Sequence, residues 1–181
     1  PFPQDGRWHT LVLVRRPRSA ELYLDGQSVA RLDRELRGPA GNEFRIGRQY
    51  GGYAEYFAGR IAEIVVWDED LDAAQARAHL PGVLQGHEKF LAALVRFDRP
   101  GEIAERIRGT AARAINLQWW QATAQDARWA PLNLRQPVAC TSVLQLDGRR
   151  SYAAFERALI PTSGPFSVAI TFASAHPSEG Y

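Results

Sequence analysis

Short segments with β-type patterning, separated by turn residues, are the feature that most restricts the fold of this chain. Residues 8–15 (WHTLVLVR) are almost wholly apolar, which is typical of a strand buried on both faces. An alternating segment then leads into Asp25-Gly26, a dipeptide that suits a two-residue type I′ hairpin because both turn positions favour positive φ. Residues 57–67 and 166–172 (FSVAITF) predict further strands.

One short helix is predicted after the strand at 57–67. The acidic run Asp68-Glu69-Asp70 is followed by Asp72, and Gln75 stands three residues later, which is the spacing of a capping box. Residues 73–80 are rich in alanine, and Pro81-Gly82 ends the helix. Many short strands with one short helix predict an all-β protein, an antiparallel β-sandwich of the jelly-roll type.

The apolar positions of these strands predict the hydrophobic core. We expect twelve side chains to be largely buried: Trp8, Leu11, Leu13, Leu22, Leu24, Ile46, Ile61, Ile64, Val66, Phe166, Val168 and Ile170.

Composition excludes several classes of protein. Among 181 residues, 22 are basic and 20 acidic, and the basic ones are scattered, so we expect no nucleic-acid partner. No run of 18 apolar residues occurs, so we expect no membrane span. The single cysteine, Cys140, allows neither an intrachain disulfide nor a zinc cluster, and we interpret it as a small buried residue.

The first part of the chain resembles a known family. Its motifs, in order, are Trp8-His9, Tyr23-Leu24-Asp25-Gly26, Ile46-Gly47-Arg48, Phe57-Ala58-Gly59-Arg60-Ile61-Ala62-Glu63 with Trp67, and Leu71-Asp72. This succession resembles the C-terminal half of a domain of the concanavalin A-like lectin/glucanase superfamily, in its laminin-G-like, pentraxin-like jelly-roll branch. Each motif alone is weak, but the ordered set is specific.

The last part of the chain resembles the N-terminal half of the same domain. The motifs are Leu144-Gln145-Leu146-Asp147-Gly148, then Tyr152, then the segment 163–168 (SGPFSV). The resemblance therefore implies the end of one copy followed by the start of a second, with both copies incomplete. It divides the chain into 1–98 (half a jelly roll with a connector), 99–140 (an irregular linker) and 141–181 (the first strands of a second copy). A single sandwich closed from these halves would lack several middle strands and leave unpaired edges.

The resemblance implies a function without catalysis. We expect a recognition module of a larger extracellular or cell-surface protein, with a glycan or a protein as its ligand and with neighbouring domains of a longer chain as partners. A structural spacer of a multi-domain toxin or adhesin is the alternative, and a glucanase-type glycoside hydrolase is less favoured, because the superfamily hosts all three roles. No cofactor is expected.

The loop around residues 48–57 carries the candidate ligand-binding residues. Exposed tyrosines stack on the apolar face of a sugar ring, and arginine and glutamine donate hydrogen bonds to its hydroxyl groups. The candidates are Arg48, Gln49, Tyr50, Tyr53 and Tyr56. An alternative remains open, in which some of these rings pack into the core and the others only cover the loop.

The acidic residues do not indicate a catalytic or metal site. Asp68, Glu69, Asp70 and Asp72 stand where a strand ends and a helix begins, where acids cap the helix. We therefore expect no calcium site. Glycoside hydrolysis needs a pair of carboxylates on one face. Glu63 lies alone within a predicted strand, and we interpret it as a strand-edge or ion-paired acid. The resemblance implies a structural role for His9, which follows Trp8.

Overall fold

The computed structural model describes residues 2–35, 44–49, 55–79, 84, 88–97, 112–115, 118–120, 143–155, 158–161 and 163–175. The described elements are β1 (Asp5–Arg16), β2 (Ser19–Leu24), β3 (Gln27–Leu32), β4 (Phe44–Ile46), β5 (Ala58–Trp67), α1 (Ala73–Ala78), β6 (Leu91–Arg96), β7 (Ala112–Ile115), β8 (Gln118–Trp120), β9 (Val143–Asp147), β10 (Tyr152–Phe155) and β11 (Phe166–Ala175). The predicted all-β class with one short helix is confirmed for this part of the chain, and every strand pair in it is antiparallel.

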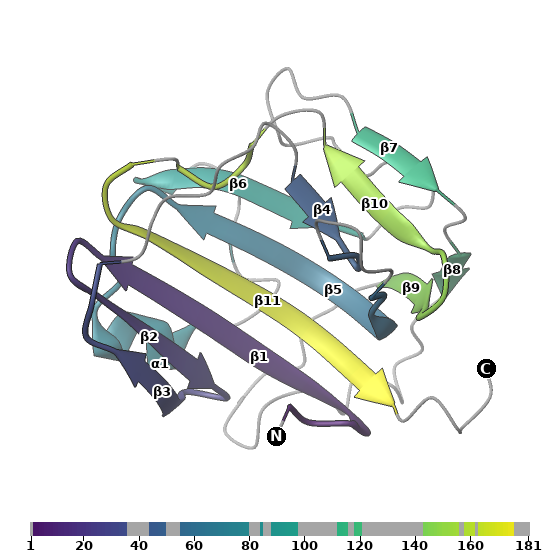
Figure 1. The fold of residues 1–181 in the computed structure, drawn as a ribbon, viewed down its shortest axis with the longest axis horizontal. Helices are drawn as coiled ribbons and strands as arrows, with labels where there is room; N and C mark the ends of the chain where they lie inside the picture. Colours follow the sequence, from purple (N-terminus) through teal and green to yellow (C-terminus); the bar gives the residue numbers. More distant parts are fainter. Residues whose placement is uncertain are drawn as a thin grey trace.

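Eight strands form one large sheet, in the order β3-β2-β1-β11-β5-β9-β8, with β6 also paired to β5 (Figure 1). The central strand β11 lies between β1 and β5. Leu13 is opposite Val168 on one side of β11, and Ile170 is opposite Ile64 on the other. The segment 143–175 thus completes a sheet that the first 98 residues begin. The division of the chain into parts of two successive copies stays a prediction.

A second, three-stranded sheet, β4-β10-β7, lies over one part of the large sheet (Figure 1). Phe155 of β10 and Ile46 of β4 belong to the core cluster that also contains Ile64, Val168 and Phe172 of the large sheet. This is the packing of a β-sandwich, in which the apolar faces of two sheets meet. The opposite face of the large sheet packs Val65, Leu71 and Ala76 into a separate cluster beneath α1.

The local predictions for the hairpin and the helix are confirmed. Asp25 and Gly26 have φ of 50° and 77° and join β2 to β3 by a two-residue turn, as a type I′ hairpin requires. The Asp72 carboxylate accepts from the Gln75 backbone N–H at 2.8 Å, and the Gln75 side chain accepts from the Asp72 backbone N–H at 2.8 Å. This capping box begins α1, which ends at Ala78 rather than at the predicted residue 80.

The predicted core is confirmed for seven side chains and wrong for five. Trp8, Ile46, Ile61, Ile64, Val66, Phe166 and Val168 are buried. In contrast, Leu11, Leu13, Leu22, Leu24 and Ile170 are only half-buried. The reason is geometric: these five lie on β1, β2 and β11, where the smaller sheet does not cover the face they share. Residues of opposite parity on the same strands, such as Val12 and Tyr23, are fully buried on the other face.

No helix in the described part of the chain has the length and apolar character needed to cross a membrane.

Candidate functional site

Residues 47–49 and 55–57 pair with each other and form a short stem between β4 and β5. Arg48 is paired with Tyr56 in an antiparallel bridge, and the Gln49 backbone N–H donates to the Glu55 carbonyl at 3.0 Å. Gly47 begins the stem at a φ of 84°, a conformation that favours glycine. The stem therefore fixes the backbone of three predicted site residues, Arg48, Gln49 and Tyr56. The predicted residues Tyr50 and Tyr53 lie outside the described residues, as does Cys140.

A cation–π cluster forms where this stem meets β10. The Arg48 guanidinium lies 5.4 Å from the centroid of the Tyr56 ring and 5.1 Å from that of the Tyr152 ring. The two ring centroids are 6.4 Å apart and their planes are inclined by 50°. All three side chains are half-buried, so each keeps some contact with solvent, and Gln49 beside them is exposed. We call Arg48, Tyr56 and Tyr152 the arginine–tyrosine cluster.

Tyr152 was missing from the predicted site. The sequence shows it as part of a family-like motif, but no local signal indicates that it faces Arg48, because the two residues are distant in the sequence. They meet because β4 and β10 are neighbours in the smaller sheet, with Ile46 opposite Ala153. Nothing in the sequence indicates that β4 and β10 pair.

A tight turn before β10 holds the start of that strand in place. Asp147 Oδ1 accepts from the backbone N–H groups of Arg149, Arg150 and Ser151, each at 2.9 Å. Burial opposes ionisation of this carboxyl, but the three donors outweigh it and hold the pKa of Asp147 well below its usual range. Its negative charge is thus bound to the backbone next to Tyr152.

Of the two interpretations of Glu63, a strand-edge acid or an ion-paired acid, the ion-paired one is confirmed. Glu63 is 1% exposed, and its Oε2 accepts from Arg96 Nε at 2.6 Å. His79 Nε2 lies 3.7 Å from Glu63 Oε1, and the Trp67 and His79 rings meet edge to face at 5.2 Å. Burial, with the nearby Arg96 charge, lowers the pKa of His79 to about 4, so this imidazole is neutral at pH 7.

The buried His79 makes stability depend on pH in a defined window. Its folded pKa is about 4 and its unfolded value is 6.5, so between these pH values the unfolded chain binds a proton that the folded chain does not. Stability must therefore fall as pH falls through this window, by about 3 kcal/mol at most. We expect a His79→Gln variant to lose less stability than the wild type between pH 7 and pH 4.5, measured by urea unfolding. Parallel profiles for the two proteins would refute the assignment.

His9 hydrogen-bonds to two carboxylates, in agreement with the structural role that the resemblance implies. Its Nδ1 lies 2.7 Å from Asp25 Oδ2 and its Nε2 lies 3.0 Å from Asp5 Oδ1, while Asp25 Oδ1 accepts from the Thr10 backbone N–H at 2.8 Å. Burial disfavours charge on the imidazole, but the hydrogen bonds to both carboxylates outweigh it and raise the pKa of His9. The contacts link the start of β1 to the β2–β3 turn.

The acidic run before α1 is engaged in structural contacts. Asp72 caps the helix, and Asp70 pairs with Arg16 at 3.2 Å. The Ser167 hydroxyl bridges the same segment to β11, because it donates to the Glu69 carbonyl and accepts from the Leu71 backbone N–H, both at 2.9 Å. Within the described ranges, no group of three or more His, Cys, Asp or Glu residues is arranged to hold a metal ion.

A comparison with family models agrees with this architecture. Residues 1–77 match the laminin-G-type model described as the concanavalin A-like lectin/glucanases superfamily. This part of the chain is therefore similar to a domain of that superfamily, in agreement with the resemblance of its motifs. The match does not extend to β9–β11, so a second copy stays a prediction. Searches of curated proteins and of solved structures gave no significant match.

Proposed function

We propose that this chain is a non-catalytic recognition module that binds glycans at the arginine–tyrosine cluster, with Gln49 beside it. The observation that carries the proposal is the position of Arg48 beside two half-buried tyrosine rings, at 5.4 and 5.1 Å from their centroids. Superfamily membership alone supports no particular ligand, because the fold hosts lectins and hydrolases alike.

The chemistry of the cluster suits a sugar ring. A pyranose has an apolar CH face, which stacks on a phenol ring, and a rim of hydroxyl groups, which accept hydrogen bonds from a guanidinium or an amide. The two rings are inclined by 50°, so a planar ligand stacks on one of them at a time. Each such contact contributes about 1 kcal/mol. A single site of this kind has an affinity near the millimolar range.

The roles of three acids in the described part of the chain support a proposal without catalysis. Glycoside hydrolysis needs two carboxylates on one face, one of them able to give up a proton. Glu63 is instead paired with Arg96, Asp72 caps α1, and Asp147 is held by three backbone donors. We therefore keep a glucanase-type activity as the less favoured reading.

A structural spacer is the second candidate function, and the cluster itself supplies its argument. The same cation–π contacts attach this stem (residues 47–49 and 55–57) to β10, which is useful in a scaffold that binds no ligand. For either function, we expect the chain to be part of a larger extracellular or cell-surface protein. If it is a recognition module, a protein is the alternative ligand to a glycan. Weak sites gain avidity there if copies of the domain are joined in tandem.

The proposal predicts graded losses of binding on a glycan panel. Tyr152→Ala removes one ring and should weaken binding of any retained glycan about fivefold, and Tyr56→Ala with Tyr152→Ala should weaken it about 30-fold. Binding is measured by glycan array and then by isothermal titration.

Phe90→Ala is the matched control, because Phe90 is an aromatic residue 46% exposed outside the cluster. The glycan affinity of the Phe90→Ala variant should equal that of the wild type. If the wild type retains no glycan, while Tyr152→Ala lowers the melting temperature, glycan binding is rejected and the spacer function takes its place.

A further inference from the structure

Arg48 carries a positive charge that no acid among the described residues balances. Other arginines of the chain have such a partner: Arg16 pairs with a carboxylate of the acidic run, and Arg96 pairs with a buried one. The side chain of Arg48 instead contacts the rings of Tyr56 and Tyr152, and its Nε is buried without a hydrogen-bond partner. A ring face attracts a cation but does not neutralise its charge. The guanidinium is therefore able to pair with an anion from outside the protein.

The acids that flank the cluster in the sequence do not supply this balance. Glu55 stands on the same stem, but it is exposed and, within the described ranges, forms no ion pair with the guanidinium. Asp147, in the turn before Tyr152, accepts from three backbone N–H groups through Oδ1. The same turn contains two exposed arginines, Arg149 and Arg150, which add positive charge close to Tyr152 in the sequence. This excess of positive charge favours an anionic ligand.

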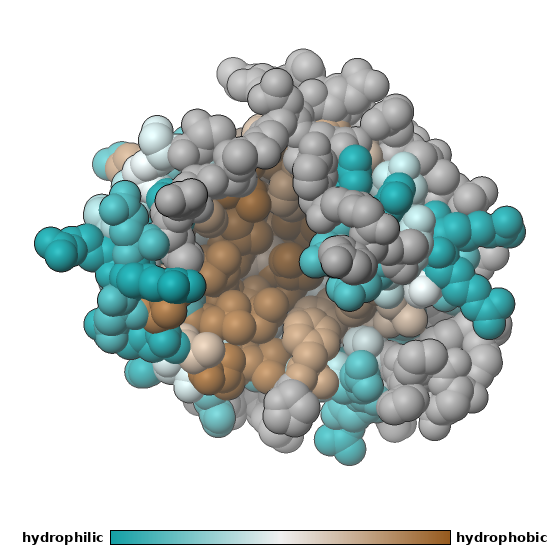
Figure 2. Space-filling model, viewed as in Figure 1, coloured by the Kyte–Doolittle hydropathy of each residue, from teal (hydrophilic) through white to brown (hydrophobic). Residues whose placement is uncertain are grey.

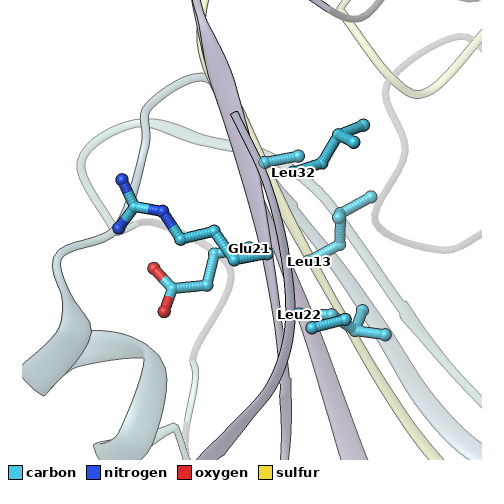
Figure 3. Close-up of a pocket in the computed structure, with 7 residues that line it drawn as sticks. Leu13, Glu21, Leu22 and Leu32 are labelled. Carbon is cyan, nitrogen blue, oxygen red and sulfur yellow. The ribbon is translucent and has the colours of Figure 1, made fainter. Parts of the chain in front are cut away.

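The apolar surface of the large sheet is unsuited to an anionic sugar. Figure 2 shows this surface as a hollow of hydrophobic residues. In Figure 3, Leu13, Leu22 and Leu32 point to one side of the sheet, whereas Glu21 points to the other. A sugar placed on these leucines would leave its hydroxyl groups without hydrogen bonds, and a charged sugar would also lose the water around its charge. An acidic glycan therefore fits the arginine–tyrosine cluster better than it fits this surface.

We infer that the glycan bound at the arginine–tyrosine cluster contains a hexuronate, whose carboxylate pairs with the Arg48 guanidinium while its ring stacks on Tyr56 or Tyr152. The inference rests on the proposed function and narrows its ligand class. A guanidinium has coplanar N–H donors that match the two oxygens of a carboxylate. In a hexuronate the carboxylate is bonded directly to the pyranose ring, so a single sugar offers both the apolar face and the anion. A neutral sugar leaves the charge of Arg48 unbalanced.

The test compares acidic trisaccharides with neutral forms of the same sugars. The probes are the trimers of galacturonate, glucuronate and mannuronate, each paired with its fully methyl-esterified form, which keeps the ring and loses the charge. We expect the full chain to bind at least one acidic trimer, and to bind the ester of that trimer about fivefold more weakly, as suits an ion pair that is partly exposed to solvent. Isothermal titration at pH 7 measures both affinities.

Substitutions of Arg48 test whether this residue recognises the charge. Arg48→Gln should bind the acid and its ester equally, because only the charge distinguishes the two probes. Arg48→Lys keeps the charge without the planar group, so it should retain a weaker preference, about twofold. Arg18→Gln is the matched control: it removes the same charge from an exposed residue between β1 and β2, and it should leave the preference unchanged. Melting temperatures show that each variant folds.

The possible outcomes separate this inference from the proposed function. Equal affinity of the wild type for an acid and its ester, or binding of neutral glycans alone, overturns the hexuronate inference and leaves glycan binding in place. A preference for the acid that persists in Arg48→Gln also overturns it, and so does tighter binding of galactose 6-sulfate than of galacturonate. If no glycan binds, acidic or neutral, the proposed function fails and the inference fails with it.

Discussion

The Arg96→Met substitution is expected to lower the free energy of unfolding by about 3–5 kcal/mol. Arg96 Nε lies 2.6 Å from Glu63 Oε2, and Glu63 is 1% exposed. Methionine fills a similar volume but removes the guanidinium that balances the Glu63 charge. In the wild type His79 supplies no balancing charge at pH 7, because burial and the Arg96 charge lower its pKa. Urea unfolding at pH 7 measures the effect.

The matched control removes both charges of this pair. Glu63→Gln combined with Arg96→Met leaves no buried carboxylate to be balanced, so it should be clearly more stable than Arg96→Met alone. A loss below about 1 kcal/mol in the single variant would contradict the buried ion pair. A double variant less stable than the single one would show that the charge of Glu63 has other support.

The Ile64→Ala substitution is expected to cost about 2–5 kcal/mol, because it leaves a cavity in a closely packed core. Ile64 is 1% exposed on β5, where it belongs to the cluster between the two sheets together with Phe155 and Phe172. The loss of stability appears as a lower midpoint of urea unfolding. The dependence of the unfolding free energy on urea concentration should not change, since unfolding exposes a similar surface area in both proteins.

Leu13→Ala provides the comparison for Ile64→Ala. Leu13 lies on β1, which is also a strand of the large sheet, but its side chain is half-buried because the smaller sheet does not reach it. The cost should be no more than about 1.5 kcal/mol, since less apolar surface returns to water and no closed cavity forms. Equal losses for the two variants would mean that the face of β1 that carries Leu13 is covered in solution.

The candidate site was predictable only where its residues are close in the sequence. Arg48, Gln49 and Tyr56 stand on one hairpin stem, and a stretch rich in tyrosine and glycine is visible in the chain. Tyr152 joins them through the pairing of β4 with β10. Similarly, Glu63 was identified as a structural acid from its place within a strand, but its partners Arg96 and His79 come from β6 and from the end of α1.

The sequence by itself determined the elements that local chemistry controls. The Asp25-Gly26 turn, the Asp72–Gln75 capping box and the long apolar strands depend on backbone preferences and on side chains a few residues apart. The ordered motifs of residues 1–77 also identified the superfamily.

Only the tertiary structure decided which face of each strand is covered. The apolar run of β1 predicts burial on both sides, yet Val12 and Val14 are buried while Leu11 and Leu13 are half-exposed. The strand β11 between β1 and β5 and the position of the smaller sheet produce that difference. The hydrophobic pattern shows which side chains are suited to burial. A side chain is buried only where another sheet or helix packs over it, and pairing between segments distant in the sequence determines where that happens.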